Sequence, residues 1–252
     1  MEENLINYRV TIEYNGEHFC GFQYQPNCRT VEGEIEKVLT EILGKETKIY
    51  ASGRTDSGVH ALGQVGNFFC TEPNKQKLLH QINDKLPEDV KLLNIVEVPA
   101  EFDSRFSAKK KTYGYRFYLS RYERPLFESF ALRVNDNVDV KKMADSAGEF
   151  VGEYDFTSFV ARKSGKTNFV RKIYDAKINC LDKNQQLYEF EITANGFLYN
   201  MVRIIFGTLL DVGYSRKQKE DIKKIILAKD RTKAGKTMPA KGLVLKSVCY
   251  EN

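Results

Sequence analysis

Residues 53–60 have the sequence Gly53-Arg54-Thr55-Asp56-Ser57-Gly58-Val59-His60. Short apolar runs flank them, and we predict a strand on each side, near residues 47–52 and 64–70. The Asp-Ser-Gly sequence favours a turn, because Asp can bond its own backbone and Gly accepts positive φ. A purely structural turn is therefore one interpretation. It does not explain an arginine beside the aspartate, and loops held by strands often carry catalytic groups.

The segments on either side of this loop alternate between strand and helix patterns. Residues 6–14 alternate apolar and polar side chains, which predicts a half-buried strand. Thr30 is a candidate N-cap for a helix that ends at Gly44, because apolar side chains recur between them at helical spacing. Similar patterns predict a helix over 78–86, strands at 92–98, 112–119, 169–181, 186–194 and 242–250, and helices over 140–151, 197–212 and 216–228.

Strand-rich segments separated by single helices are typical of α+β proteins, in which helices pack on one face of a sheet. The pattern divides the chain into two broadly similar halves, and we place the boundary between residues 105 and 106. We interpret residues 1–105 as an N-terminal α+β half that carries the Asp56 loop, and residues 106–252 as a C-terminal α+β half. We expect residues 120–138 to be irregular.

Tyr113 follows a basic run, Lys109-Lys110-Lys111, at the start of an alternating segment. It shares a predicted strand face with Tyr115 and Phe117. Packing in the core explains such a tyrosine as well as a functional role does, so both interpretations stay open from the pattern alone.

Arg203 lies within an apolar segment that we expect to form a buried helix. A guanidinium group in such a place needs a carboxylate, a phosphate or several carbonyl groups as partners. It could reach the surface along its own aliphatic stem or pair with Asp211 or another acid. It could instead approach Asp56 and hold that carboxylate ionised.

The net charge is +5, and the basic residues are clustered. Residues 105–124 hold seven basic and one acidic side chain, residues 160–177 hold six and one, and residues 216–246 hold eleven and three. Each cluster alone could be solvated surface. Three clusters interleaved with Tyr and Phe favour a nucleic-acid partner, which offers phosphates and stackable bases.

The five cysteines are scattered, without the spacing of a disulfide framework or a zinc site, so we expect neither of these. We expect the protein to work in a reducing, cytoplasmic setting. We expect no signal peptide, because the start is acidic and soon becomes a strand. The longest apolar run, near residues 201–212, is interrupted by charged residues and is too short to span a bilayer. We therefore expect no membrane association.

Taken together, these motifs resemble the tRNA pseudouridine synthase A family along most of the chain. The longest match is the segment 53–61 around Asp56. The other matching segments, in the order of the family, are 14–16 with 21–25, 29–32, 105–108 leading to 113–115, 155–159, 197–203, and 234–237 through 242–243.

The resemblance implies two α+β halves related by a pseudo-twofold axis, with a mixed, largely antiparallel sheet and a basic cleft between the halves. It also implies a homodimer that acts on tRNA. The family isomerises uridine to pseudouridine in the anticodon stem-loop, typically at positions 38–40, and uses no metal and no organic cofactor. The product joins the same base to the sugar through carbon, so no group needs to be donated.

By the same resemblance, Asp56 is the nucleophile, Tyr113 stacks on the target base, and Arg203 pairs with Asp56. Arg54 helps to extrude or hold the target nucleotide, and Thr55 and His60 complete the candidate substrate-binding set. A loop histidine beside glycines, however, more often bonds the backbone. Attack by Asp56 on the base, attack on the ribose, and removal of a sugar proton are all compatible with the sequence.

Three residues depart from the family pattern. Phe22 stands where the family usually has Trp, Thr112 stands where a basic residue is common, and Met238 replaces a small residue. None of these departures replaces Asp56, so we expect them to affect the range of substrates rather than the activity itself. The alternative hypothesis is a non-catalytic tRNA-binding or tRNA-chaperone protein on the same scaffold, which would not need Asp56.

Overall fold

The computed structural model describes residues 5–161 and 168–251. The chain forms two compact units, and the boundary follows Lys109. The N-terminal unit also includes the returning chain from Leu245 onward, whereas the C-terminal unit is Lys110–Val244. Part of the basic cluster predicted at 160–177, residues 162–167, lies outside the described residues.

The N-terminal unit is built on a sheet with the strand order β4-β1-β3-β10, and β2 pairs with β3. The β1 strand is antiparallel to both β3 and β4. These strands are β1 (Ile6–Tyr14), β2 (Tyr50–Ala51), β3 (His60–Cys70), β4 (Val90–Val98) and β10 (Leu243–Cys249). The register of β1 on β3 shifts between Ile12 and Tyr14, at the end of β1 that leads toward the Asp56 loop.

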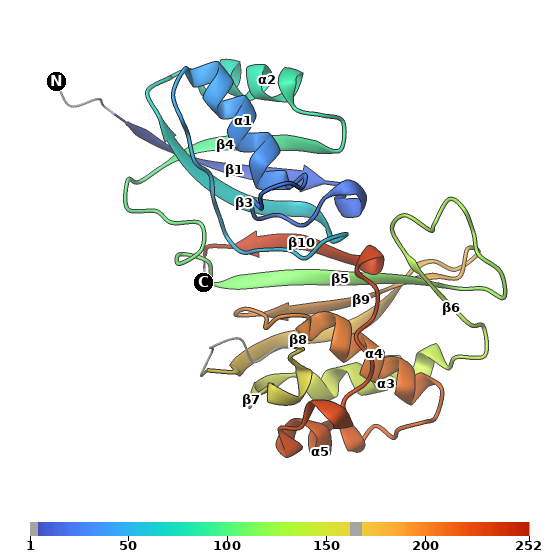
Figure 1. Ribbon diagram of the computed structural model, residues 1–252. Helices are drawn as coiled ribbons and strands as arrows, with labels where there is room; N and C mark the ends of the chain where they lie inside the picture. The colour runs from blue at the N-terminus through green and yellow to red at the C-terminus, as the bar shows by residue number, and fades with distance from the viewer. Residues whose placement is uncertain (1–4, 162–167, 252) are drawn as a thin grey trace. The chain divides into compact units, whose positions relative to one another are not determined.

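Two helices pack together on one side of these strands, α1 (Val31–Leu43) and α2 (Lys75–Lys85) (Figure 1). The start of α1 is confirmed: the hydroxyl of Thr30 accepts a hydrogen bond from the backbone N–H of Gly33. Its end is also confirmed, because Gly44 adopts φ +69°, the left-handed conformation that favours glycine after a helix. The N-cap at Thr30 and the glycine at position 44 both act within one turn of the helix, which explains why the sequence alone predicted them.

The C-terminal unit has the strand order β5-β9-β8-β7, with β6 paired to β5. The β5-β9, β9-β8 and β8-β7 pairs are antiparallel, whereas β6 runs parallel to β5. These strands are β5 (Lys110–Leu119), β6 (Leu132–Val134), β7 (Gly152–Asp155), β8 (Val170–Asp182) and β9 (Leu187–Ala194). The expected α+β class with a mixed, largely antiparallel sheet is therefore confirmed.

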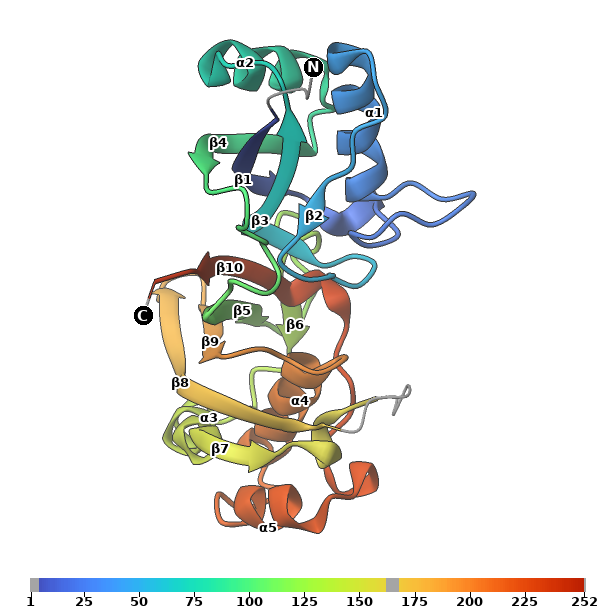
Figure 2. The same ribbon diagram turned by 90° about the vertical axis from the view of Figure 1, so that its left-hand side faces the viewer.

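The α-helices of this unit are α3 (Val140–Ala147), α4 (Met201–Gly213) and α5 (Asp221–Ala228). Figure 2 shows α3 and α4 together on one side of β8 and β9. Phe206 of α4 stacks on Tyr115 with ring centroids 4.2 Å apart and also contacts Phe117 and Phe190, which makes the core of this unit strongly aromatic. Short 3-10 helices occupy Gly16–His18, Gly148–Phe150, Thr157–Phe159, Arg231–Lys233 and Ala240–Gly242.

Several sequence predictions of element bounds were wrong, among them the helix expected over 216–228, which begins only at Asp221. The helix expected from residue 197 begins at Met201, because Asn200 adopts a left-handed φ of +60°. The helix expected over 140–151 ends at Ala147, where the chain tightens into a 3-10 turn. The strand expected near 47–52 pairs only at Tyr50–Ala51, and the segment 120–138 contains β6. Periodicity identifies apolar faces but does not report hydrogen-bond partners.

None of the helices in the described ranges, 5–161 and 168–251, is long and apolar enough to cross a membrane. All five cysteines are free thiols.

Candidate active site

The Asp56 loop connects β2 to β3 and contains a closed turn. The backbone N–H of Val59 donates to the carbonyl of Asp56 at 3.2 Å, and Gly58 has φ +76°. The turn predicted from Asp-Ser-Gly is therefore present. Asp56 itself is partly exposed and Arg54 is exposed, whereas Thr55 is buried. Arg54 is thus open to solvent, Asp56 keeps some solvent access, and the hydroxyl of Thr55 points inward.

Thr55 anchors the loop to β1. Its hydroxyl lies 2.8 Å from that of Tyr14, in a buried hydrogen bond. Burial raises the pKa of the Tyr14 hydroxyl, so it stays protonated and can donate. The carbonyl of Thr55 accepts from the backbone N–H of Phe22, so two separate segments hold the residue that precedes Asp56.

His60, the first residue of β3, holds the other end of the loop. Its Nδ1 accepts a hydrogen bond of 3.1 Å from the backbone N–H of Gly16, and its side chain is buried. The expectation that this histidine bonds backbone is confirmed. Gly16 must lack a side chain here, because a Cβ would lie 2.0 Å from the carbonyl oxygen of Val59. Close backbone approach therefore fixes the position of the residues that follow Asp56.

Gln64 supports the start of the loop, and the sequence analysis did not identify it. The side chain is fully buried; its Oε1 accepts from the hydroxyl of Ser52 at 2.7 Å, and its Nε2 donates to the carbonyl of Gly53 at 2.8 Å. A buried amide with both ends satisfied is a strong constraint on the backbone that it touches. An isolated Gln in a strand pattern carries no local signal for this role.

The segment 19–32 lies beside the loop. The hydroxyl of Ser57 donates to the carbonyl of Phe19, and Gly21 adopts φ +97° where a Cβ would lie 2.8 Å from the carbonyl oxygen of Thr55.

Glu32, in the same segment, accepts a hydrogen bond from the backbone N–H of Tyr24. Burial raises the pKa of the Glu32 carboxyl, while the positive charge of Arg54 opposes that shift. Two of the matched motifs are therefore neighbours in space.

Tyr113 lies on β5 in the C-terminal unit and is half-buried. Its ring meets that of Phe197 edge to face, with centroids 5.1 Å apart. The expected shared face is present, but Tyr115 and Phe117 are fully buried whereas Tyr113 is not. An aromatic neighbour thus fixes the plane of a ring that still has solvent access.

Arg203 lies in the first turn of α4 and is half-buried. Its Nε donates to the carbonyl of Met238 at 2.6 Å, and one terminal nitrogen donates to Oδ1 of Asn200 at 2.8 Å. Asp211, considered above as a partner, forms its ion pairs with Arg216 and Lys217 instead. Polar groups within the C-terminal unit therefore set the orientation of this guanidinium.

The chain around Met238 crosses α4 at very short range. A Cβ on Gly207 would lie 2.0 Å from the carbonyl oxygen of Lys236, and Gly235 donates its N–H to the hydroxyl of Thr208 at 2.9 Å. This crossing places the Met238 carbonyl against Arg203. Any residue at 238 could supply that carbonyl, so its departure from the family pattern leaves the support of Arg203 intact.

The other two departures are also accommodated. Phe22 is buried, with its ring centroid 6.1 Å from that of Tyr14, so it serves as part of the wall behind the Asp56 loop. Thr112 pairs with Thr193 across β5 and β9, their hydroxyl oxygens 2.9 Å apart. Both residues keep the local architecture without supplying a charge.

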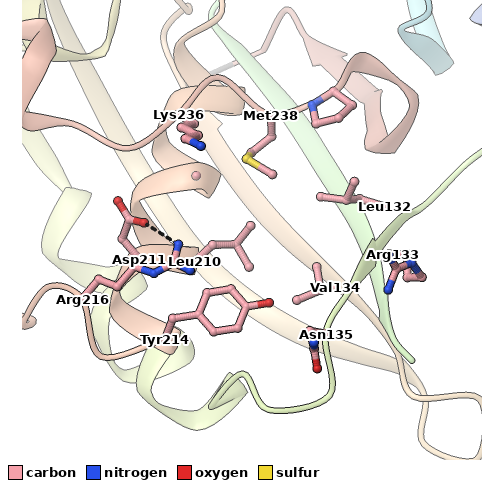
Figure 3. Close-up of a pocket in the computed structure, with 12 residues that line it drawn as sticks. Leu132, Arg133, Val134, Asn135, Leu210, Asp211, Tyr214, Arg216, Lys236 and Met238 are labelled. Atoms are coloured by element: carbon pink, nitrogen blue, oxygen red, sulfur yellow. Dashed lines mark ion pairs between the residues drawn. The ribbon is translucent and has the colours of Figure 1, made fainter. Parts of the chain in front are cut away.

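A separate pocket of about 320 Å³ lies in the C-terminal unit beside α4 (Figure 3). Its walls include Val134, Leu210 and Met238, and the Asp211–Arg216 ion pair lies at one side. None of the candidate site residues predicted from the sequence lines it. Among the described residues, no group of three or more His, Cys, Asp or Glu side chains is arranged to hold a metal ion.

Comparison with known proteins identifies the family. The family model described as tRNA pseudouridine synthase matches residues 10–107 and 147–251. The chain is 44% identical over 248 residues to tRNA pseudouridine synthase A of Caldicellulosiruptor saccharolyticus, covering 98% of this chain and 100% of the relative. It is 41% identical over 248 residues to the protein of the same name from Clostridium acetobutylicum, with the same coverage. The chain therefore belongs to the tRNA pseudouridine synthase family.

Proposed function

We propose that this protein converts uridine to pseudouridine in tRNA and that Asp56 is its catalytic carboxylate. The protein is an isomerase by its family. The observation that carries the assignment of Asp56 is the construction of its loop: the residues before and after it are tied to buried groups, while Asp56 itself remains partly exposed. A rigid scaffold with one accessible carboxylate suits a group that must meet a substrate in a defined geometry.

The reaction breaks the bond between N1 of uracil and C1′ of ribose and forms a bond between C5 and C1′. The proton lost from C5 is balanced by one gained at N1, so substrate and product are isomers. A carboxylate can promote this exchange by adding covalently to the base or the sugar, or by taking a sugar proton. Each route requires Asp56 to be ionised.

We assign the other candidate residues by their surroundings. Tyr113, held edge-on by Phe197, is the proposed surface on which the detached uracil turns, and Arg203 is the proposed cationic partner of Asp56. Arg54, exposed one residue before Thr55, is the proposed contact to the extruded nucleotide. Thr55 and His60 act by holding the loop, because their polar atoms bond Tyr14 and Gly16.

We further propose that the substrate uridines lie in the anticodon stem-loop, typically at positions 38–40, and that the protein works as a homodimer in the cytoplasm. A uridine in a helical stem must be flipped out, which costs a few kcal/mol. Basic side chains offset that cost by contacting phosphates. Cations and rings are interleaved in the C-terminal unit, where Lys110 and Lys172 both lie over Tyr174.

The assignment is tested with Asp56→Asn, which keeps the shape of the side chain and removes its charge. We expect pseudouridine formation in tRNA transcripts to fall by about a thousandfold or more, with binding of tRNA retained. Asp136→Asn is the matched control, because Asp136 is an exposed acid of the C-terminal unit. It should keep full activity.

The same experiment separates the two candidate functions. A non-catalytic tRNA-binding protein would bind tRNA equally well with either residue at position 56 and would produce no pseudouridine in any variant. If Asp56→Asn isomerised uridine at the wild-type rate, the protein would still be an enzyme, but the proposed role of Asp56 would be wrong.

A further inference from the structure

Phe106 is exposed in a way that sets it apart from the other phenylalanines. Its side chain is 80% accessible to solvent, whereas every other phenylalanine of the chain is buried or half-buried. Leaving such a ring in water forgoes about 1.5–3 kcal/mol that burial would provide. The mechanism proposed above does not use this residue, although it lies in one of the matched motifs.

A tight turn presents the ring. Oδ1 of Asp103 accepts hydrogen bonds from the backbone N–H groups of Arg105, at 2.7 Å, and Phe106, at 2.8 Å. The backbone N–H of Ser107 donates to the carbonyl of Asp103 at 3.0 Å and closes the turn. Aspartate in this arrangement holds the backbone directly, so the position of Phe106 is defined before anything binds.

Three side chains, two of them buried, hold this turn against the sheet of the N-terminal unit. The amide of Asn7 donates to the carbonyl of Phe102 at 3.0 Å, and Oδ1 of Asn67 accepts from the N–H of Ser104 at 3.0 Å. The hydroxyl of Tyr250 donates to the carbonyl of Ser104 at 2.8 Å. Retreat of the ring into the core would break hydrogen bonds that are buried or partly buried, so its exposure is built into the fold.

A cation lies close to the ring, and a second one follows in the chain. The guanidinium of Arg105 lies 5.4 Å from the centroid of the Phe106 ring, and Lys109 is exposed three residues later. Protein partners usually cover a larger apolar patch, with aromatic anchors surrounded by other contacts. A single exposed ring on a fixed backbone, with a cation close to it, fits a nucleic acid better, because bases stack on aromatic side chains while cations contact the phosphates.

From this geometry we infer that Phe106 stacks on an unpaired base of the RNA substrate and that Arg105 contacts the adjoining phosphate. The inference rests on the proposed action on tRNA. It makes Phe106 a binding residue that recognises the face of a base, and so it should tolerate any large aromatic side chain and reject alanine.

The absence of tryptophan from the chain provides a direct test. Phe106→Trp creates a single tryptophan, and stacking on a base should quench its fluorescence when tRNA is added and restore it when salt displaces the RNA. Leu93→Trp is the matched control, because Leu93 is 51% exposed on β4 of the same unit. Its fluorescence should change little. Equal quenching at both positions, or none at Phe106→Trp while the variant binds tRNA, would overturn the inference.

Kinetics provide the second measurement. Phe106→Ala should raise KM for tRNA about tenfold with little change in kcat, whereas Phe106→Tyr and Phe106→Trp should retain the wild-type KM. An unchanged KM in Phe106→Ala would contradict stacking. Emission of Phe106→Trp that depends on protein concentration without RNA would also overturn it, in favour of a second copy as the partner. Quenching of Phe106→Trp fluorescence by tRNA, together with no pseudouridine formation by the wild-type protein, would retain this inference and reject the proposed function.

Discussion

The hydroxyl of Tyr14, at the end of β1, lies 2.8 Å from that of Thr55, which precedes Asp56. The two residues are 41 positions apart in the chain, and both are buried. This bond ties the loop to the sheet at the point where the register of β1 on β3 shifts. The position of Asp56 therefore depends on β1, which contacts the loop through an uncharged hydroxyl group.

Removing either hydroxyl should leave the other one buried without this hydrogen-bond partner. We expect Tyr14→Phe and Thr55→Val each to lower the free energy of unfolding by about 1–3 kcal/mol and to reduce kcat. The double variant should lose less than the sum, with a coupling of about 1 kcal/mol. Urea denaturation of the four proteins measures the cycle, and strictly additive losses would show that the hydrogen bond does not stabilise the fold.

Gly16 should be intolerant of a side chain. We expect Gly16→Ala to lower the free energy of unfolding by about 1–3 kcal/mol and to reduce activity, because the new Cβ would displace Val59 and the loop with it. Gly148→Ala is the control: no heavy atom lies within 4 Å of its added Cβ, and φ is −60°. Thermal denaturation should show little change or slight stabilisation for this control. Equal effects of the two substitutions would contradict the close approach.

Lysine should not replace Arg203. A single ammonium group cannot match the planar fork that reaches the carbonyl of Met238 and the amide of Asn200 together. We expect Arg203→Lys to cost about 1 kcal/mol of stability and to slow isomerisation at saturating tRNA. Arg216→Lys is the matched control and should change neither quantity, because the Arg216 side chain is 68% exposed in its ion pair with Asp211. Wild-type stability and kcat in Arg203→Lys would refute the special geometry.

Acid should weaken the N-terminal unit through Asp89. Hydrogen bonds from Arg29 hold the pKa of the Asp89 carboxyl below its usual range. The folded state therefore binds a proton less readily than the unfolded chain. The stabilisation is complete above the unfolded pKa of about 4 and is lost as the pH falls through the folded pKa.

Asp89→Asn should remove this contribution, which we expect to be about 1 kcal/mol because the pair is partly exposed. The difference in unfolding free energy between wild type and Asp89→Asn should be present at neutral pH and disappear in strong acid. Urea denaturation over a pH series provides the measurement, with Asp136→Asn as the exposed control. A difference that grows as the pH falls would give the wrong sign and reject the assignment.

Several features of the fold were predictable because their causes are local. Thr30 and Gly44 bound α1 through contacts within one turn of the helix. The alternating pattern of residues 6–14 identified β1 for the same reason, since a strand with one buried face repeats every two residues. By contrast, Asn200 in a left-handed conformation delays the start of α4 to Met201, and no periodic signal marks such a residue.

The sequence by itself determined the family, through motifs that match along most of the chain, and identified a candidate carboxylate in an Asp-Ser-Gly turn. Only the tertiary structure decided how that aspartate is held. The groups that position its loop, Tyr14, Gly16 and Gln64, come from β1, the segment after it and β3. Their roles follow from strand register and from the close approach of two backbones, which are properties of distant segments brought together and leave no periodic trace in either segment alone.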